Sequence, residues 1–115
     1  MKRLCLIRDI CRSISEYEQE FQKEHSICLN EGMVICSLKE GKLSSGEIAK
    51  KINLTCSNTS KVIRSVEEKG FIERDMGVED KRQMYFSLTE KGTAILSEIE
   101  AVDINLTYPL DKLVF

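Results

Sequence analysis

A run of short polar and basic side chains between residues 55 and 69 has the composition of a surface that binds nucleic acid. Hydroxyl and amide groups can hydrogen-bond base edges in the major groove, and Lys or Arg can bind guanine or a phosphate. At 100° per residue, one helical side carries these groups and the opposite side is apolar, with Ser57, Asn58, Lys61 and Arg64 on the first and Val62, Ile63 and Val66 on the second. The pattern indicates a recognition helix, although any surface helix is also polar towards solvent.

A second candidate lies in the segment 79–86, which reads EDKRQMYF. Asp80 and Arg82 are two residues apart, so they project from the same side of an extended strand, where the carboxylate can hold the guanidinium. A held arginine suits the negative potential of a narrow minor groove. The alternative is a surface ion pair that contributes about 0–1 kcal/mol and has no further role.

Local signals predict the elements that position these groups. Ser44 and Glu47 form a capping box at the start of one short helix, and Asn53 tolerates the left-handed backbone that ends it. Thr55 caps the next helix, and Gly70 ends it. Two helices joined by about three residues predict a helix-turn-helix.

The chain before this motif is also expected to be helical. Apolar residues recur at spacings of three and four between residues 4 and 21, which predicts a long first helix packed against other helices. Asn30 is a candidate cap for a second helix that Gly41 would terminate, and Leu43 is left as a short connector.

The chain after the motif predicts a hairpin and a last helix. Residues 70–75 and 83–89 are strand candidates on either side of a polar turn, and Thr89 caps a fifth helix whose apolar seam runs to Leu106. Pro109 must break that helix. The expected fold is mainly α with a small β-hairpin wing (α+β), in the order of a winged helix-turn-helix.

Composition fits one ordered domain. The chain has 115 residues, 31% of them charged, with one proline and six glycines. The net charge is −2, but residues 42–91 carry ten bases against eight acids, and the flanking regions are acidic. Arg8 and Asp9 cut the first apolar run far short of a signal peptide or membrane span, which predicts a cytoplasmic protein with no membrane partner.

The sequence offers little for catalysis or metal binding. The five cysteines lack C-x-x-C spacing, and the only histidine, His25, has no partner at zinc-ligand spacing. There is no nucleophile with a base and an orienting acid, and no glycine loop for phosphate. We therefore expect no metal, no cofactor and no enzymatic activity.

Residues 54–92 resemble the MarR family of bacterial winged-helix transcription regulators. The resemblance is carried by the Leu54-Thr55 turn, the helix with Ser57 and Lys61, the Asp80-x-Arg82 wing and the sequence LTEKG at 88–92. A weaker match, LSSGEIAKKI, extends it upstream, so that it covers about residues 30–100.

The resemblance implies a homodimer on a pseudo-palindromic operator in double-stranded DNA, with recognition helices in major grooves and wing arginines in minor grooves. Arg82 would be the minor-groove reader and Asp80 its holder. It also implies one MarR-like domain over 1–115, with the DNA-binding lobe at about 30–92 and dimerisation helices at about 3–24 and 90–113. The candidate DNA-binding residues are Ser57, Asn58, Ser60, Lys61, Arg64, Arg74, Asp80, Lys81 and Arg82.

Relatives in this family respond to small-molecule effectors or to oxidants through a cysteine of the first helix. Cys5 and Cys11 are therefore redox-sensing candidates, since Arg8 lies one turn from each. The alternative is that both thiols act as small hydrophobic side chains. A different class of function also stays open, because a winged helix can bind a protein instead of DNA.

Overall fold

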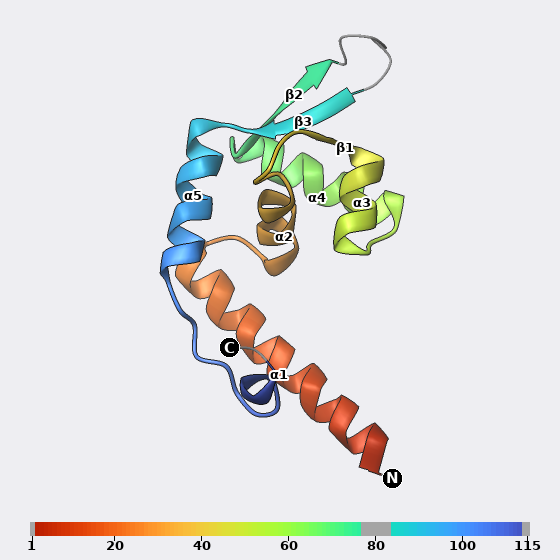
Figure 1. Cartoon of the computed structure of the whole chain (residues 1–115), viewed down its shortest axis with the longest axis vertical. Helices are drawn as coiled ribbons and strands as arrows, with labels where there is room; N and C mark the ends of the chain where they lie inside the picture. The colour runs from red at the N-terminus through yellow and green to blue at the C-terminus, as the bar shows by residue number, and fades with distance from the viewer. Residues whose placement is uncertain (1, 77–83, 114–115) are drawn as a thin grey trace. The chain divides into compact units, whose positions relative to one another are not determined.

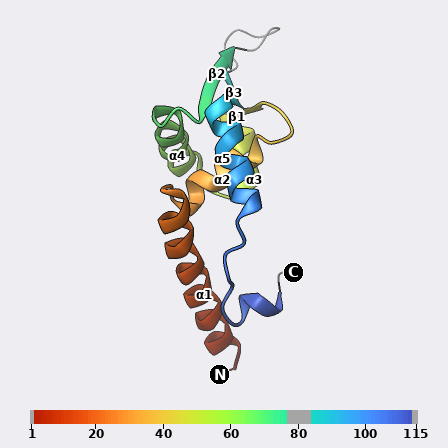
Figure 2. The same ribbon diagram turned by 90° about the vertical axis from the view of Figure 1, so that its left-hand side faces the viewer.

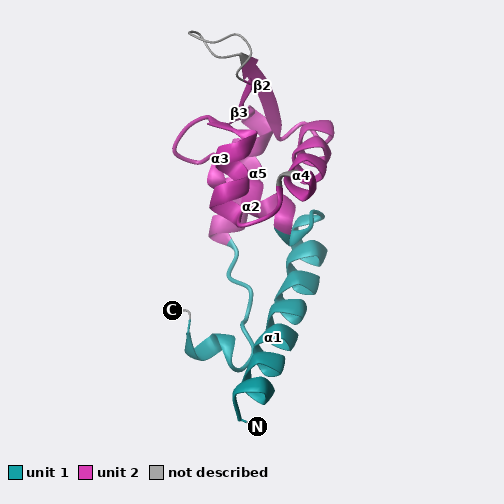
Figure 3. Cartoon of the chain, turned by 90° about the vertical axis from the view of Figure 1, so that its right-hand side faces the viewer, with its two compact units in different colours: residues 1–29, 102–115 teal, residues 30–101 magenta. Residues whose placement is uncertain are grey.

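The computed structural model describes residues 2–76 and 84–113, and it divides the chain into two compact units. Unit 1 comprises residues 1–29 and 102–115, and unit 2 comprises residues 30–101 (Figure 3). The elements are α1 (Lys2–His25), α2 (Leu29–Ser37), β1 (Leu43–Ser44), α3 (Ser45–Ile52), α4 (Cys56–Glu68), β2 (Ile72–Met76), β3 (Met84–Leu88), α5 (Glu90–Ala101) and the 3-10 turn η1 (Leu110–Lys112) (Figure 1).

The described residues of unit 2 form the helices α2, α3, α4 and α5 and an antiparallel sheet with the strand order β1-β3-β2. The expected hairpin is confirmed, since β2 pairs with β3 from Ile72 opposite Leu88 to Met76 opposite Met84. The expectation that Leu43 is only a connector is wrong, because Leu43 pairs with Phe86 as part of β1. A two-residue strand carries too short an alternation of polar and apolar residues to be recognised from sequence.

The core of unit 2 is formed by apolar side chains from its helices and from the sheet. Each helix contributes the apolar face that its sequence period predicts. The fully or almost fully buried members are Val34, Ile35, Leu38, Ile48, Ala49, Ile63, Val66, Phe71, Ile72, Phe86 and Leu96. This core holds α3 and α4 as a helix-turn-helix beside the sheet (Figure 1).

The predicted capping signals are present. Ser44 and Glu47 form both hydrogen bonds of the capping box, at 3.2 and 3.0 Å, and Asn53 ends α3 with a left-handed φ of 57°. Gly70 has a φ of 83°, one residue after the C-cap Lys69. Glycine relieves the strain of that conformation, which is why α4 ends there.

The fifth helix, which its apolar seam predicts to run to about Leu106, is shorter in the structure. Its start is as predicted, with the Thr89 hydroxyl accepting a hydrogen bond from the Gly92 backbone amide at 3.0 Å. The helix ends at Ala101, and residues 102–107 form no helix or strand. These residues include Val102, Asp103, Ile104, Asn105 and Thr107, all β-branched or short and polar, and such residues have low helix propensity.

Unit 1 consists of α1 and the C-terminal segment, which runs back beside α1 (Figure 2). The Ser13 hydroxyl lies 2.8 Å from both the carbonyl oxygen and the hydroxyl of Thr107, and it donates to the carbonyl. Ser13 is buried, so these bonds satisfy a polar group that water does not reach. Among the described residues, no helix is both long and apolar enough to cross a lipid bilayer.

Candidate nucleic-acid interface

The start of α4 is fixed by Thr55. The Thr55 side chain accepts a hydrogen bond from the Asn58 backbone amide at 3.2 Å, and its carbonyl accepts one from the Thr59 hydroxyl at 2.8 Å. A threonine in this position satisfies one of the free amides at a helix N-terminus. The first turn, which carries several of the candidate contacts, is therefore held in helical geometry.

The two faces of α4 separate as the sequence predicts. Thr59, Ile63 and Val66 are buried, and Val62 is half-buried. All five candidate contacts on this helix are exposed: Ser57, Asn58, Ser60, Lys61 and Arg64. Within the part of the chain that the structure describes, neither Lys61 nor Arg64 forms an ion pair, so both charges remain available to a partner.

Arg74 lies on β2 and is exposed, but it is not free. Its Nε donates a hydrogen bond to Oε2 of Glu67 on α4 at 2.8 Å, and its guanidinium lies 5.8 Å from the centre of the Phe86 ring. The hydrogen bond and the charge of Glu67 raise the pKa of Arg74 above its usual value. The guanidinium thus joins the wing strand to the C-terminal half of α4.

The remaining wing candidates, Asp80, Lys81 and Arg82, lie outside the described residues. The strands on either side of them are described, and the last pair in the ladder before this segment is Met76 with Met84. The expected contact between the Asp80 carboxylate and the Arg82 guanidinium therefore stays a prediction.

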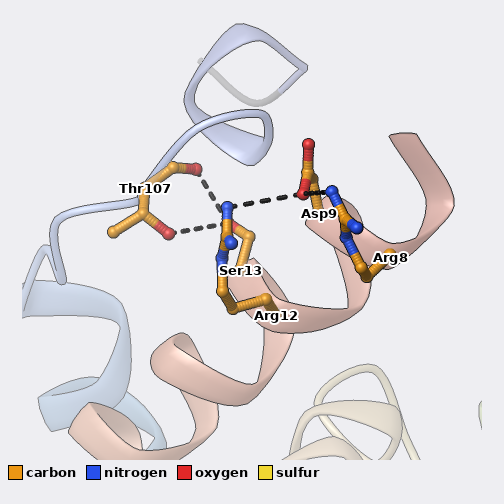
Figure 4. Close-up of polar contacts among 5 residues, drawn as sticks. All are labelled: Arg8, Asp9, Arg12, Ser13 and Thr107. Carbon is orange, nitrogen blue, oxygen red and sulfur yellow. Dashed lines mark hydrogen bonds and ion pairs between the residues drawn. The ribbon is translucent and has the colours of Figure 1, made fainter. Parts of the chain in front are cut away.

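The two candidate sensor thiols, Cys5 and Cys11, are exposed on α1. The Arg8 guanidinium, one turn from each thiol, lies 3.5 Å from Oδ1 of Asp9. The same oxygen forms an ion pair with Arg12, also at 3.5 Å (Figure 4). The expected cation near the thiols is thus directed to a carboxylate of the same helix. Over the described ranges, no group of three or more His, Cys, Asp or Glu is arranged to hold a metal ion.

Comparison with known proteins agrees with this geometry. The model of the MarR family matches residues 30–84. The chain is 33% identical over 89 residues to YkoM of Bacillus subtilis, an uncharacterised helix-turn-helix transcriptional regulator, and the match covers 76% of this chain and 58% of YkoM. Residues 30–84 of the chain belong to the MarR family. The chain spans a little over half the length of YkoM and of a similar curated helix-turn-helix regulator from Methanothermobacter thermautotrophicus.

Solved structures of MarR proteins have the same fold. A MarR variant from Escherichia coli in complex with operator DNA aligns with a TM-score of 0.76 and 21% identity, covering 87% of this chain and 74% of that one. MepR of Staphylococcus aureus, also in a DNA complex, aligns with a TM-score of 0.73 and 23% identity, covering 84% and 72%. The expected winged-helix fold, mainly helical with a small sheet, is confirmed.

One set of polar contacts between α2 and α4 was not predicted from the sequence. Glu31 on α2 is buried and bound to Ser65 and Lys69 of α4. One signal was available, because Glu31 shares the helical face of Ile35 and Leu38, at spacings of four and seven. An acid on an apolar face requires a partner, although the sequence does not say which.

Proposed function

We propose that the chain is a sequence-specific transcriptional regulator, acting as a repressor, that binds double-stranded DNA in the cytoplasm as a homodimer and needs no cofactor or catalytic group. The observation that carries this proposal is the exposed polar and basic face of α4, opposite an inner face on which Thr59, Ile63 and Val66 are buried. Its likeness to a named regulator, YkoM, and the DNA in the MarR and MepR structures support it.

On the proposed operator, the N-terminal half of α4 enters the major groove. Ser57, Asn58 and Ser60 lie where short polar groups reach base edges, and Lys61 and Arg64 bind guanine or phosphate. The wing adds contacts beside the helix: Arg82 in the minor groove with Asp80 as its holder, and Lys81 and Arg74 on the backbone.

The proposed homodimer uses apolar residues that unit 1 leaves in solvent. Leu4, Ile7 and Ile14 are 62%, 54% and 41% exposed, and their spacings of three and seven put them on one face of α1. In a dimer, a two-fold axis would relate the two recognition helices, as a pseudo-palindromic operator requires. Replacing Ile7 and Ile14 together by Glu should give a monomer in analytical ultracentrifugation, and a variant that stays dimeric would contradict this interface.

Selection of bound fragments from the host genome tests DNA binding directly. We expect one sequence class to be enriched, and a gel-shift titration should then show a steep salt dependence. A dimer that contacts about 6–10 phosphates loses about 10³–10⁵ in affinity between 50 and 200 mM salt. Failure to bind any fragment at 50 mM salt would favour a protein-binding winged helix.

Single substitutions test the assigned residues on the selected operator. Lys61→Ala should reduce the salt slope by about 2, because each lost phosphate contact lowers it by about 0.9 and the dimer has two copies. Arg82→Ala should weaken binding more than Lys2→Ala, which changes an exposed lysine at the N-terminal end of α1. Equal affinities for Arg82→Ala and Lys2→Ala, with unchanged circular dichroism, would count against the wing assignment.

A redox role for Cys5 and Cys11 stays a prediction. Their exposure supports it, whereas Arg8, the neighbouring cation, forms an ion pair with Asp9. If either thiol is a sensor, peroxide should weaken operator binding in the wild type and leave the Cys5→Ser/Cys11→Ser double variant unchanged. Equal responses of the two proteins would remove both cysteines from consideration.

A further inference from the structure

Glu31 is a buried carboxylate in a helix of apolar character. Its residue exposure is 5%, and Val34 and Ile35, which follow it on α2, are completely buried. An ionised carboxylate removed from water is costly unless hydrogen bonds and an opposite charge compensate it. Its partners therefore identify what the carboxylate holds.

Two partners of Glu31, Ser65 and Lys69, lie on α4. The Ser65 hydroxyl donates to Oε2 at 2.7 Å, and the Lys69 ammonium donates to Oε2 at 2.7 Å and to Oε1 at 2.9 Å. Ser65 and Lys69 are four residues apart and so lie on the same side of α4 at its C-terminal end. One carboxylate thus joins α2 to two successive turns at the end of α4.

The same end of α4 is held by two further contacts. The Lys69 carbonyl accepts a hydrogen bond from the Lys91 ammonium at 2.7 Å, and Glu67 accepts the bond from Arg74. The candidate base contacts begin at Ser57, twelve residues before Lys69, which is about 18 Å along the helix at 1.5 Å per residue. A tilt of about 10° at the held end would therefore move the first turn by about 3 Å, more than the range of a hydrogen-bond distance.

We propose that Glu31 is a positioning residue for DNA recognition, whose carboxylate fixes the orientation of α4 through Ser65 and Lys69. This inference rests on the proposed function. Base contacts require the side chains to be placed within a few tenths of an ångström, whereas contacts with the phosphate backbone tolerate displacement. Loss of the carboxylate should therefore weaken binding to the operator more than binding to an unrelated duplex.

The test compares both affinities in Glu31→Gln and in the wild type, by fluorescence anisotropy at one salt concentration. Glutamine keeps the size of the side chain and can still accept from Ser65, but it cannot neutralise Lys69. We expect the ratio of operator to unrelated affinity to fall at least tenfold, with the unrelated affinity changed less than threefold. A second variant, Lys69→Met, removes the other side of the pair and should lower the ratio similarly.

The double variant Glu31→Gln/Lys69→Met separates positioning from general damage. If the two residues act through each other, the double variant loses no more specificity than either single variant. The matched control is Glu100→Gln, which removes the carboxylate of the exposed pair with Lys39 (2.8 Å) on the same unit and should leave the ratio unchanged.

The outcomes are distinguishable. If the wild type binds its operator and the folded variants keep its affinity ratio, or lose both affinities equally, the positioning role is overturned and the proposed function stands. If the wild type binds no DNA, the proposed function fails, and the positioning role fails with it. Where Glu31→Gln does not fold, Ser65→Ala, which leaves the charge pair intact, is expected to lower the ratio, and an unchanged ratio there is again a refutation.

Discussion

Gly92 lies in the first turn of α5, where that helix approaches the chain that follows α4. A Cβ atom built on Gly92 would lie 1.9 Å from the Phe71 carbonyl oxygen and 3.0 Å from its carbonyl carbon. Non-bonded carbon and oxygen atoms approach to about 3.3 Å at closest, so the backbone would have to shift by more than about 1 Å. Neither atom belongs to a flexible side chain that could rotate away.

The cost of Gly92→Ala follows from what the shift disturbs. The Phe71 carbonyl accepts a hydrogen bond from the Thr89 amide at 3.0 Å. Overpacking costs about 1–3 kcal/mol and the weakened hydrogen bond about 1 kcal/mol, while alanine regains about 1 kcal/mol of helix propensity. The net loss is about 1–3 kcal/mol in the free energy of unfolding, which corresponds to a melting temperature lower by roughly 4–20 °C.

Gly46 provides a matched control for the same substitution. It also lies in the first turn of a unit 2 helix, α3, and a Cβ there would meet only the Ser44 hydroxyl, at 4.0 Å. Gly46→Ala should therefore stabilise the fold by up to about 1 kcal/mol. Urea titrations of both variants measure the difference. A Gly92→Ala variant as stable as the wild type would refute the reasoning, as would equal effects at the two glycines.

Three further predictions concern α4, α3 and α2. Thr55→Ala should lower the unfolding free energy by about 1 kcal/mol in urea titrations, because it removes the cap of α4, and Thr55→Ser should restore most of it; no loss would refute the cap. Hydrogen bonds from Ser44 hold the pKa of Glu47 below its usual value, so this group stabilises the fold above the ordinary glutamate pKa and loses that contribution as the pH falls through the lowered one. The wild type should accordingly have a higher free energy of unfolding than Glu47→Gln at pH 7, and this difference should vanish towards pH 3. A difference that grows in acid would contradict the prediction. Burial and the nearby Glu100 carboxylate raise the pKa of Cys36, so its alkylation at pH 7.5, followed by peptide mass spectrometry, should be faster in Glu100→Gln; an unchanged rate would exclude the charge effect.

The parts of the fold that sequence analysis predicted are those stabilised by neighbours in sequence. A capping box spans four residues, and the left-handed turn at Asn53 depends on that residue alone. The cap at Thr55 acts on an amide three residues away. All the residues that make up such a signal lie within about four positions of one another, and each of these three signals is present in the structure.

The parts that sequence analysis missed depend on distant partners. β1 exists because Leu43 pairs with Phe86, 43 residues later, and nothing near Leu43 indicates that edge. At the end of α5 the sequence predicted too much structure instead of too little. The apolar repeat continues to Leu106, but the residues after Ala101 have low helix propensity, and the helix ends at Ala101. A repeat of apolar residues does not by itself specify a helix.

The candidate site shows why counting charges along the sequence is insufficient. Residues 42–91 have a surplus of bases, yet three of those bases are paired in the structure: Lys69 with the buried Glu31, Arg74 with Glu67, and Lys42 with Asp75. Paired cations contribute less to the field that a phosphate backbone experiences, because the neighbouring carboxylate cancels much of it. If the chain binds DNA as proposed, the attraction among the described candidates therefore comes mainly from Lys61 and Arg64, whereas the pairs of Lys69 and Arg74 join α4 to α2 and to β2.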